Sequence, residues 1–402
     1  MKPLADLTII DLTRILSGPF STMFFADMGA NVIKVEPPNG DDTRTWGPPF
    51  LETESSYFLS INRNKKSIVL DLKSETGKNV LRQLIKKADV VIENFRPGTL
   101  ERLGFGFENL KTINPRIILA SISGFGQTGR YRDEPGYDLI AQGMGGLMSV
   151  TGQTDGHPVK GGFSLADVGS GMWAIIGILT ALHNRNSNGN AQWIDVSLLE
   201  TMISWQTYLS GNYFASGKNP KAMGSAHPNI CPYQAFPAKD GYFNLAVGND
   251  KLWEIFCKAV NEQAWLENEN FKTNPDRVRN RETLIPLLES KFKTKTVNEW
   301  VTIFRKQKIP CGPIYNLSEL FEDPYVIERN MLQTVEHPTA GRIKLVNTPV
   351  KFLETTSEDA KITPPPLLGQ HTEQILREFD INETEIKEVL KNIPTIPVLL
   401  QS

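Results

Sequence analysis

Short apolar runs alternate with amphipathic stretches along residues 1–216. The runs are rich in β-branched residues, which is typical of buried strands, and they lie at 7–12, 31–36, 66–72, 89–95, 115–123 and 191–198. A helix at 19–29 is predicted by Pro19 near its start and Gly29 at its end, and a helix at 75–88 is predicted by the capping residue Ser74. Further helices are predicted to start near 167 and 199. Apolar strands that alternate with helices predict a Rossmann-like parallel sheet covered on both faces.

The pattern changes near residue 217, which predicts a second domain. Residues 217–229 are rich in Gly, Pro, Asn and Ser, as linkers are. A strand near 242–247 and helices near 250–260, 279–292 and 296–308 predict a smaller α+β domain over 217–325. The last segment, 326–402, contains a proline-rich stretch and two predicted short strands, near 332–336 and 342–347. We expect this segment to return to the large α/β domain, which begins with residues 1–216.

Composition narrows the classes of protein that fit. The 402 residues include 43 basic and 45 acidic side chains, a net charge of −2, with 40% hydrophobic content. This balance is typical of a globular protein with no nucleic-acid or anionic-membrane partner. The N-terminus leads straight into a strand, without a signal or transit pattern, and no uninterrupted apolar run is long enough to span a membrane. We therefore expect a cytoplasmic location.

Cysteines and histidines give no metal pattern. The three cysteines (Cys231, Cys257 and Cys311) are far apart and odd in number, which fits a reducing compartment. The five histidines are not spaced as a pair of metal ligands would be. We therefore predict that no metal takes part in catalysis.

A glycine motif follows the strand at 115–123 but lacks its structural context. Gly124, Gly126 and Gly129 have the spacing of a dinucleotide-binding turn, yet residues 130–138 contain a proline and a glycine and do not predict the helix that the motif requires. A turn at the carboxyl edge of the sheet is the better interpretation. The basic run at 62–66 is most often a solvated loop, although it could supply cations for a phosphorylated ligand.

Asp167 is the main candidate for chemistry. An Asp in the first turn of a helix is commonly a cap, and that interpretation stays open. Glycines at 161, 162, 169 and 171 surround it, and we expect them to clear space for a bulky ligand. The helix dipole is expected to lower the pKa of this carboxyl and keep it ionised. An uncrowded, ionised carboxylate is a possible covalent nucleophile.

Eight motifs resemble a known family along almost the whole chain. They are LTRILSGPF with DMGANVIKVEPP, DDTRTWGPPF, NRNKKSIVLDLK, ENFRPGTLERLG, GFGQTG, PGYDLIAQGMGGLMSVTG, ADVGSGMWAIIGILTAL and PPPLLGQHT. The chain resembles the class III, CaiB/BaiF-type CoA-transferases. Within that family it is most similar to the succinyl-CoA-dependent branch acting on dicarboxylates such as glutarate or hydroxymethylglutarate.

The resemblance implies a mechanism and a set of site residues. Asp167 matches the nucleophile that carries CoA as an aspartyl thioester, helix-end amides near it would hold the oxyanions, and the CoA thioester is a substrate, so no cofactor is expected. The CoA-binding positions are Leu16, Ser17, Leu70, Asp71, Leu72, Lys73, Asn94, Phe95, Arg96, Arg102, Tyr137 and Asp138, with Lys73 and Arg102 at phosphates. Gly248 and Asn249 match a lid, Pro37 replaces a cation that touches CoA in some relatives, and the family forms interlocked homodimers.

The predicted function is transfer of CoA from an acyl-CoA, succinyl-CoA above all, to a free dicarboxylate. A distal carboxylate needs a partner, and Arg44 or the amides of the Gly248–Asn249 turn are the candidates. The alternative is an α-methylacyl-CoA racemase of the same fold. That branch carries a histidine where this chain has Tyr137, which is a poor base at neutral pH. A non-catalytic acyl-CoA-binding protein and a nicotinamide oxidoreductase fit the motifs less well.

Overall fold

The structure is a computed structural model that describes residues 2–353 and 362–391, and the chain divides into two compact units. The first unit comprises residues 1–146, 161–207 and 327–402, and the second comprises 147–160 and 208–326. The segments 147–160 and 208–216, which the sequence assigned to the large domain, therefore belong to the second unit. The C-terminal segment from Ile327 belongs to the first unit.

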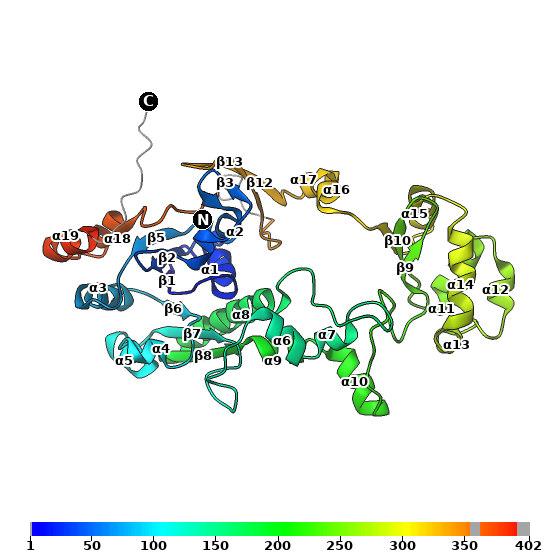
Figure 1. The fold of residues 1–402 in the computed structure, drawn as a ribbon, viewed down its shortest axis with the longest axis horizontal. Coiled ribbons are helices and arrows are strands. Elements are labelled where there is room, and N and C mark those ends of the chain that lie inside the picture. Colours follow the sequence, from blue (N-terminus) through cyan, green and yellow to red (C-terminus); the bar gives the residue numbers. More distant parts are fainter. Residues whose placement is uncertain (1, 354–361, 392–402) are drawn as a thin grey trace. The chain divides into compact units, whose positions relative to one another are not determined.

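The first unit is built on a six-stranded parallel sheet with the strand order β5-β2-β1-β6-β7-β8 (Figure 1). Its strands are β1 (Thr8–Asp11), β2 (Asn31–Glu36), β5 (Lys66–Val69), β6 (Val90–Glu93), β7 (Ile118–Ser123) and β8 (Gln192–Ser197). The order reverses between β1 and β6, as in doubly wound nucleotide-binding folds. This confirms the predicted Rossmann-like sheet.

Helices and two hairpins complete the first unit. The helices are α1 (Ser17–Asp27), α2 (Ser56–Ile61), α3 (Glu75–Lys86), α4 (Thr99–Arg102), α5 (Phe107–Ile113), α6 (Asp138–Met144), α8 (Leu165–Asn188), α9 (Leu198–Ser204), α18 (Thr372–Glu378), α19 (Glu383–Lys391) and the 3₁₀ turn η1 (Asp42–Thr45). The hairpins are β3 (Phe50–Leu51) with β4 (Glu54–Ser55) and β12 (Leu332–His337) with β13 (Gly341–Val346).

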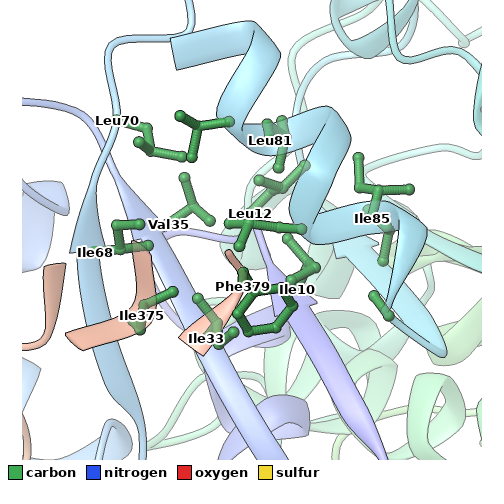
Figure 2. Close-up of a cluster of buried hydrophobic side chains, with 14 of the residues drawn as sticks. Ile10, Leu12, Ile33, Val35, Ile68, Leu70, Leu81, Ile85, Ile375 and Phe379 are labelled. Atoms are coloured by element: carbon green, nitrogen blue, oxygen red, sulfur yellow. The ribbon is translucent and has the colours of Figure 1, made fainter. Parts of the chain in front are cut away.

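One core cluster joins the two ends of the chain within this unit. Helix α3 buries Leu81 and Ile85 on one face, and its start is capped by Ser74, whose side chain accepts a hydrogen bond from the Gly77 amide. Figure 2 shows Ile375 and Phe379 of α18 among the sheet residues of the same cluster. The C-terminal helices therefore share the core of the first strands.

The second unit has its own sheet and its own aromatic core. Strands β9 (Tyr233–Pro237), β10 (Tyr242–Ala246) and β11 (Cys311–Pro313) form an antiparallel sheet in the order β11-β10-β9. Its helices are α7 (Leu147–Val150), α10 (Thr207–Ser216), α11 (Asp250–Ala259), α12 (Gln263–Glu267), α13 (Asn274–Arg279), α14 (Arg281–Phe292), α15 (Val297–Lys306) and α16 (Leu317–Glu322), with α17 (Pro324–Glu328) at its end. Phe243, Phe256, Phe292, Trp300 and Phe304 pack together, and this is a small α+β unit as predicted.

Helix α8 is the one described helix that is long and apolar enough to cross a membrane by length and composition alone. It packs against α1, α9, β7 and β8 within the first unit, and core helices of this kind pass the same test. The resemblance to a membrane span is therefore weak.

Candidate active site

A crevice opens where β1 and β6 end, at the point where the strand order reverses. Ligands of doubly wound folds bind at this place because the carboxyl ends of the parallel strands meet there. A cavity of about 280 Å³ is lined here by Arg14, Ile15, Asp42, Asn94, Phe95, Arg96, Pro97, Ser123, Gly124, Arg132, Glu134, Pro135, Gly136 and Tyr137. A second cavity, of about 310 Å³, shares Arg14 and Phe95 with it and continues to the ends of β2 and β5.

Most of the predicted CoA-binding positions lie in these two cavities. Asn94, Phe95, Arg96 and Tyr137 line the first cavity, and residues 70–73 line the second together with Pro37. Tyr137 is 65% exposed, as a residue in the wall of a binding crevice would be. The structure thus brings together positions that lie more than 60 residues apart in sequence.

Arginines gather at this crevice beyond those that the sequence singled out. Arg14 and Arg132 line the first cavity beside Arg96. A Cβ placed on Gly98, which has a φ of +80°, would lie 3.2 Å from Arg102 Nη1 and 3.6 Å from Arg132 Nη2, so both guanidinium groups face this glycine. Sequence analysis missed Arg14 and Arg132. The signal for Arg14 was a basic residue shortly after the end of β1, whereas Arg132 lies in the turn region beyond the glycine motif. Convergent cations of this kind suit the phosphates of CoA.

Asn94 has a role inside the protein that differs from the predicted CoA contact. Its Oδ1 accepts a hydrogen bond from the Arg14 amide at 2.8 Å, and its Nδ2 donates to the Arg14 carbonyl at 2.7 Å. The Ser17 hydroxyl is buried at the start of α1, 3.4 Å from the same Nδ2. These side chains hold the loop after β1, and the contact of CoA with Asn94 and Ser17 stays a prediction.

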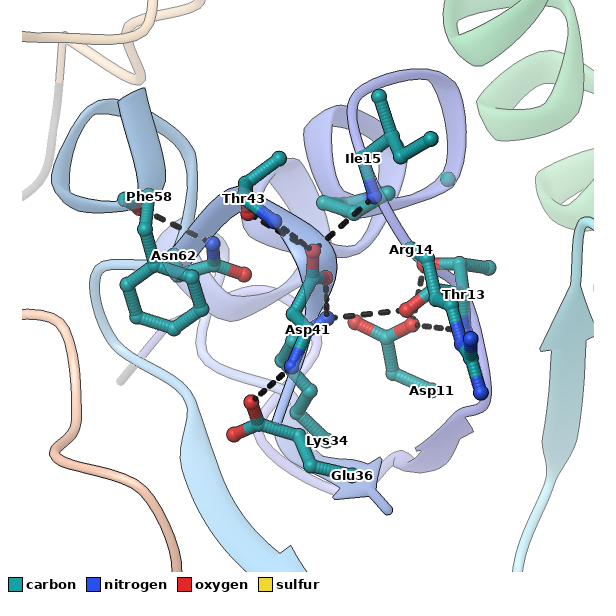
Figure 3. A network of polar contacts seen from close by, with 12 residues as sticks. Asp11, Thr13, Arg14, Ile15, Lys34, Glu36, Asp41, Thr43, Phe58 and Asn62 are labelled. Carbon is teal, nitrogen blue, oxygen red and sulfur yellow. Dashed lines mark hydrogen bonds and ion pairs between the residues drawn. The ribbon is translucent and has the colours of Figure 1, made fainter. Parts of the chain in front are cut away.

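Buried charges hold the rest of that loop. Lys34 Nζ donates to the Thr13 carbonyl at 2.9 Å and pairs with Asp41 at 2.8 Å, and both charged side chains are almost wholly buried (Figure 3). Asp11 accepts from the Thr13 amide at 2.9 Å. Ile15, a β-branched residue, has a φ of +67°, which is costly for such a side chain. The network therefore fixes a strained loop beside the crevice.

Arg44 is not free to bind a substrate carboxylate. Its Nε and Nη2 donate to the two oxygens of Glu36 at 2.7 and 2.8 Å, and its guanidinium lies 3.7 Å from the centre of the Phe58 ring. Nη2 also donates to the Pro366 carbonyl. Burial would raise the pKa of Glu36, but the Arg44 charge beside it holds that pKa below its usual range. The prediction that Arg44 meets a distal carboxylate is therefore wrong.

The basic run at 62–66 is not a solvated loop. Arg63 is buried, forms two hydrogen bonds to the Asp27 carboxylate and donates to the Val346 carbonyl. Lys65 is also buried and lies 3.2 Å from an Asp11 oxygen. Burial and the nearby Lys34 charge lower the pKa of Lys65 to about 8. These cations stabilise the fold, and they are not available to a phosphorylated ligand.

Asp167 lies in the first turn of α8, half-buried, between Ser164 and Val168. Those two neighbours line a large apolar cavity of about 970 Å³ formed mainly by α1, α2, α8 and residues 346–350. The cap hydrogen bonds at this helix start come from Asp138, whose Oδ1 accepts from the Ala166 amide at 2.8 Å and from the Asp167 amide at 3.4 Å. Asp167 is therefore not the cap, and its carboxylate is not used to accept hydrogen bonds from these helix-start amides.

The glycines around Asp167 serve mostly to let helices approach. A Cβ on Gly169 would lie 2.5 Å from the Trp205 ring, and a Cβ on Gly171 would lie 2.6 Å from the Ser17 carbonyl. A Cβ on Gly161 would collide with Leu165, and of these four glycines only Gly162 has open space beside it. The expectation that all of them clear room for a ligand is therefore wrong, because packing requires Gly169 and Gly171.

The pKa of Asp167 is raised to about 7, whereas the sequence suggested a lowered value. Burial is the main cause, and the charge of Asp138 adds to it. The helix start cannot offset these effects because Asp138 already accepts from the amides of Ala166 and Asp167. The same hydrogen bonds correct two further expectations: Asp138 is bonded inside the protein, and these two amides are not free to hold an oxyanion.

Tyr57 is a site residue that sequence analysis missed. It lines the large cavity, and its pKa is raised to about 12 by burial first and then by the charges of Asp167, Asp138 and Asp41. Its ring meets Trp46 edge to face at 5.2 Å. Nothing in the local sequence pointed to Tyr57, because its position depends on the return of α2 to the helix that carries Asp167.

The predicted lid position belongs to the second unit. Gly248 has open space around it, and Asn249 caps α11 by accepting a hydrogen bond from the Leu252 amide at 2.9 Å. The Asn249 side chain is therefore committed to the helix start.

Comparisons with known proteins agree with this arrangement. Residues 4–372 match the family described as CoA-transferase family III. The chain is 42% identical over 379 residues to succinyl-CoA:glutarate CoA-transferase of Mus musculus, covering 94% of this chain and 86% of that protein. It is 39% identical over 388 residues to succinate--glutarate CoA-transferase of Agrobacterium fabrum, covering 95% and 96%.

A solved structure of a CaiB/BaiF family protein has the same fold as this chain. A CaiB/BaiF family protein from Brucella suis superposes with a TM-score of 0.82 at 40% sequence identity, covering 94% of this chain and 99% of that one. Identity at this level over nearly complete chains goes beyond a likeness of fold alone. The chain belongs to CoA-transferase family III, and it is a CoA-transferase.

Proposed function

We propose that this protein transfers CoA from succinyl-CoA to a dicarboxylate, with glutarate as the first candidate acceptor, through a thioester on Asp167. Relatives named for succinyl-CoA and glutarate match nearly the whole chain and support this choice of substrates. The observation that carries the chemistry is the Asp167 carboxylate itself: half-buried, outside the helix cap and with a raised pKa.

The proposed reaction is a series of balanced acyl transfers. The Asp167 carboxylate attacks the thioester carbon of succinyl-CoA and the C–S bond breaks. CoA leaves as a thiolate, and a mixed succinyl–aspartyl anhydride remains. The thiolate then attacks the aspartyl carbonyl carbon and releases succinate, which leaves CoA on Asp167. The acceptor carboxylate attacks this thioester and expels the CoA thiolate, which gives a second mixed anhydride. The thiolate then attacks the acceptor carbonyl carbon of that anhydride, the C–O bond to Asp167 breaks, and the free Asp167 carboxylate is regenerated. Because thioester and anhydride are similarly activated, we propose that neither a metal nor a separate cofactor takes part.

Burial of Asp167 suits this role. A carboxylate that is poorly stabilised by its surroundings keeps more of its basicity, and basicity supports attack on a carbonyl carbon. Asp138 links the nucleophile to the crevice, because it follows the crevice residue Tyr137 and its own carboxylate meets the Asp167 amide. We place the phosphates of CoA at Lys73, Arg102, Arg14 and Arg132, and its remaining contacts along the walls of the two smaller cavities.

The assembly state and the cellular location stay predictions. Helix α8 presents an apolar stripe to solvent, with Met172 48%, Trp173 41%, Ile176 49% and Leu179 37% exposed. A stripe of this size on one helix face favours association with a partner. We propose a homodimer, interlocked as the family resemblance implies, in the cytoplasm. The partner of the acceptor's distal carboxylate also stays open.

A panel of acceptors tests the proposed function. Purified protein is incubated with succinyl-CoA and with glutarate, hydroxymethylglutarate, succinate or butyrate, and each new CoA ester is measured. We expect dicarboxylates to react roughly 10–100-fold faster than butyrate, as one contact to a charged group contributes. Equal rates with butyrate would contradict the dicarboxylate assignment. Exchange of the α-proton of the acyl group with solvent, without CoA transfer, would favour the racemase.

A further inference from the structure

A buried glutamine next to the nucleophile is not used by the mechanism so far. Gln142 of α6 has no exposed surface, yet both ends of its amide are bonded. Its Oε1 accepts from the Gly161 amide at 2.8 Å, and its Nε2 donates to Asp138 Oδ2 at 2.6 Å. A backbone N–H must donate and a carboxylate must accept, so the orientation of the glutamine amide is fixed.

The same hydrogen bonds continue to the nucleophile. Asp138 Oδ1 accepts from the amides of Ala166 and Asp167. Gln142 and Asp138, one turn apart on α6, therefore hold the segment 161–167 at both ends: Gly161 where it begins, and the first turn of α8 where it stops. Gln142 is buried and Asp138 is half-buried, and polar groups bonded to one another in this way favour a single arrangement of their neighbours.

We propose that Gln142 and Asp138 act as a clamp that positions Asp167 for attack on the thioester. The proposal rests on the proposed function and adds two positioning residues to it. The clamp holds the backbone of the nucleophile through its amide and touches neither CoA nor the acyl group. It also accounts for the half-buried carboxylate of Asp138, which family resemblance alone assigned to CoA.

The charge of the clamp supports this role. Within the part of the chain that the structure describes, two titratable groups interact with Asp167: the Asp138 carboxylate from α6 and the Tyr57 phenol from α2. The pKa of Tyr57 is raised to about 12, so this phenol is neutral at neutral pH. Asp138 is the charged one of the two, and it contributes to the raised pKa of Asp167 after burial. Loss of the Asp138 charge should therefore lower the pKa of the nucleophile.

A swap of the two side chains tests the clamp without changing its size. Asp138→Asn sets an NH₂ group against the Gln142 NH₂ group, and Gln142→Glu sets two carboxylates against each other. The double variant Asp138→Asn with Gln142→Glu restores every hydrogen bond. In this double variant the carboxylate at position 142 would accept from the Gly161 amide and from the side-chain NH₂ group at position 138. The side-chain oxygen at position 138 would accept from the Ala166 amide. Transfer from succinyl-CoA to glutarate is measured in each variant as kcat and KM, with the exposed Asp380→Asn as the control.

We expect each single variant to lower kcat roughly 10–100-fold, the effect of one misplaced buried hydrogen bond, with little change in the KM for succinyl-CoA. The double variant should recover most of that loss. Its negative charge lies farther from Asp167, so the acid limb of its pH–rate profile should move to lower pH than in the wild type. A direct contact between Asp138 and CoA predicts a raised KM and no recovery in the double variant.

Two further results keep the inference separate from the proposed function. If the wild type transfers CoA but folded single variants keep full kcat, or the folded double variant stays as slow as the singles, the clamp is wrong and the proposed function stands. If the wild type does not transfer CoA, the proposed function fails. Should Asp138→Asn not fold, Gln142→Met carries the test, because it removes both amide bonds and keeps Asp138: unchanged kcat then overturns the clamp.

Discussion

Asp167 shows how neighbours decide the behaviour of a residue whose sequence context is ordinary. A carboxylate in the first turn of a helix is normally stabilised by the helix start. Here Asp138 takes the amides of that start, and burial together with its charge raises the pKa of Asp167 to about 7. The side chain is consequently available for covalent chemistry at the expense of stability, as is common for catalytic groups.

The first prediction follows from this pKa and concerns stability. The ordinary value of 3.8 applies to the unfolded chain and about 7 to the folded one, so the folded state binds more protons between these values. Stability therefore falls as the pH rises from 3.8 to 7, and the full penalty is present above 7. Asp167→Asn cannot ionise, and its advantage in free energy of unfolding should grow by about 2–3 kcal/mol from pH 5 to pH 8.

Urea unfolding of the wild type and of Asp167→Asn at the two pH values measures this difference. The exposed Asp380→Asn serves as the control. Its free energy of unfolding should differ from that of the wild type by the same amount at pH 5 and at pH 8. An Asp167→Asn advantage that does not change with pH would mean that the carboxyl titrates normally in the folded protein.

At the scale of elements, the strained loop after β1 depends on charges brought together from three segments. Asp11 ends β1, Lys34 lies in β2, and Asp41 precedes η1 (Figure 3). Arg44 of η1 extends the same region by binding Glu36 at the end of β2 and the carbonyl of Pro366. These contacts tie the loop that borders the crevice to the sheet and to the C-terminal segment.

The second prediction separates this structural role of Arg44 from a role in substrate choice. Arg44→Met leaves the Glu36 carboxylate buried without its partner, and loss of one member of a buried ion pair lowers the free energy of unfolding by about 3–5 kcal/mol. The double variant Glu36→Gln with Arg44→Met should recover much of this lost free energy of unfolding, because no unpaired charge stays buried. The ratio of glutarate to butyrate transfer should stay at the wild-type value in folded Arg44→Met; a lost preference would return Arg44 to the substrate site.

Elements could be predicted from the sequence where the pattern is local. The strands predicted at 31–36 and 115–123 are confirmed as β2 and β7, and the helix predicted at 75–88 is confirmed as α3. Predictions failed where a long-range partner decides the outcome. Lys65 pairs with Asp11, 54 residues away, and Arg44 donates to the carbonyl of Pro366, 322 residues away, so their local sequence does not reveal these partners. Gly169 similarly looked like room for a ligand until Trp205 was placed beside it.

The site was predictable in part, through resemblance more than through pattern. Motif matching brought Leu72, Arg96 and Tyr137 to the crevice, although nothing local connects them. Tyr57 and Gln142 were missed because their importance lies in which groups they face. The direction of the Asp167 pKa shift was also wrong, because the sequence did not reveal that another carboxylate caps the same helix.

At the scale of the molecule, helix α8 connects chemistry with assembly. Its first turn carries Asp167, and its outer face exposes the stripe of Met172, Trp173, Ile176 and Leu179. Its inner face packs on α1 and on the sheet. One helix thus carries the proposed nucleophile and offers the surface through which we propose that two copies associate.

The third prediction tests that association. Trp173→Asp places a charge on the stripe, and a charge enclosed in an apolar interface is costly. We expect the proposed dimer to dissociate or to fail to form, as judged by light scattering on the purified protein. Leu287→Asp, at an apolar position of α14 in the second unit that is 42% exposed, is the matched control. A wild-type protein that is monomeric at all concentrations would contradict the assembly directly.

The central claim is that CoA becomes covalently bound to Asp167 during turnover, and direct trapping tests it. The wild type is incubated with succinyl-CoA and then treated with hydroxylamine, which converts an aspartyl thioester or anhydride to a hydroxamate. Peptide mass spectrometry should find the hydroxamate on Asp167, none in the absence of succinyl-CoA, and none in Asp167→Ala, which should also have lost transfer activity. Turnover without a modified Asp167, or activity of Asp167→Ala within tenfold of the wild type, would contradict the account.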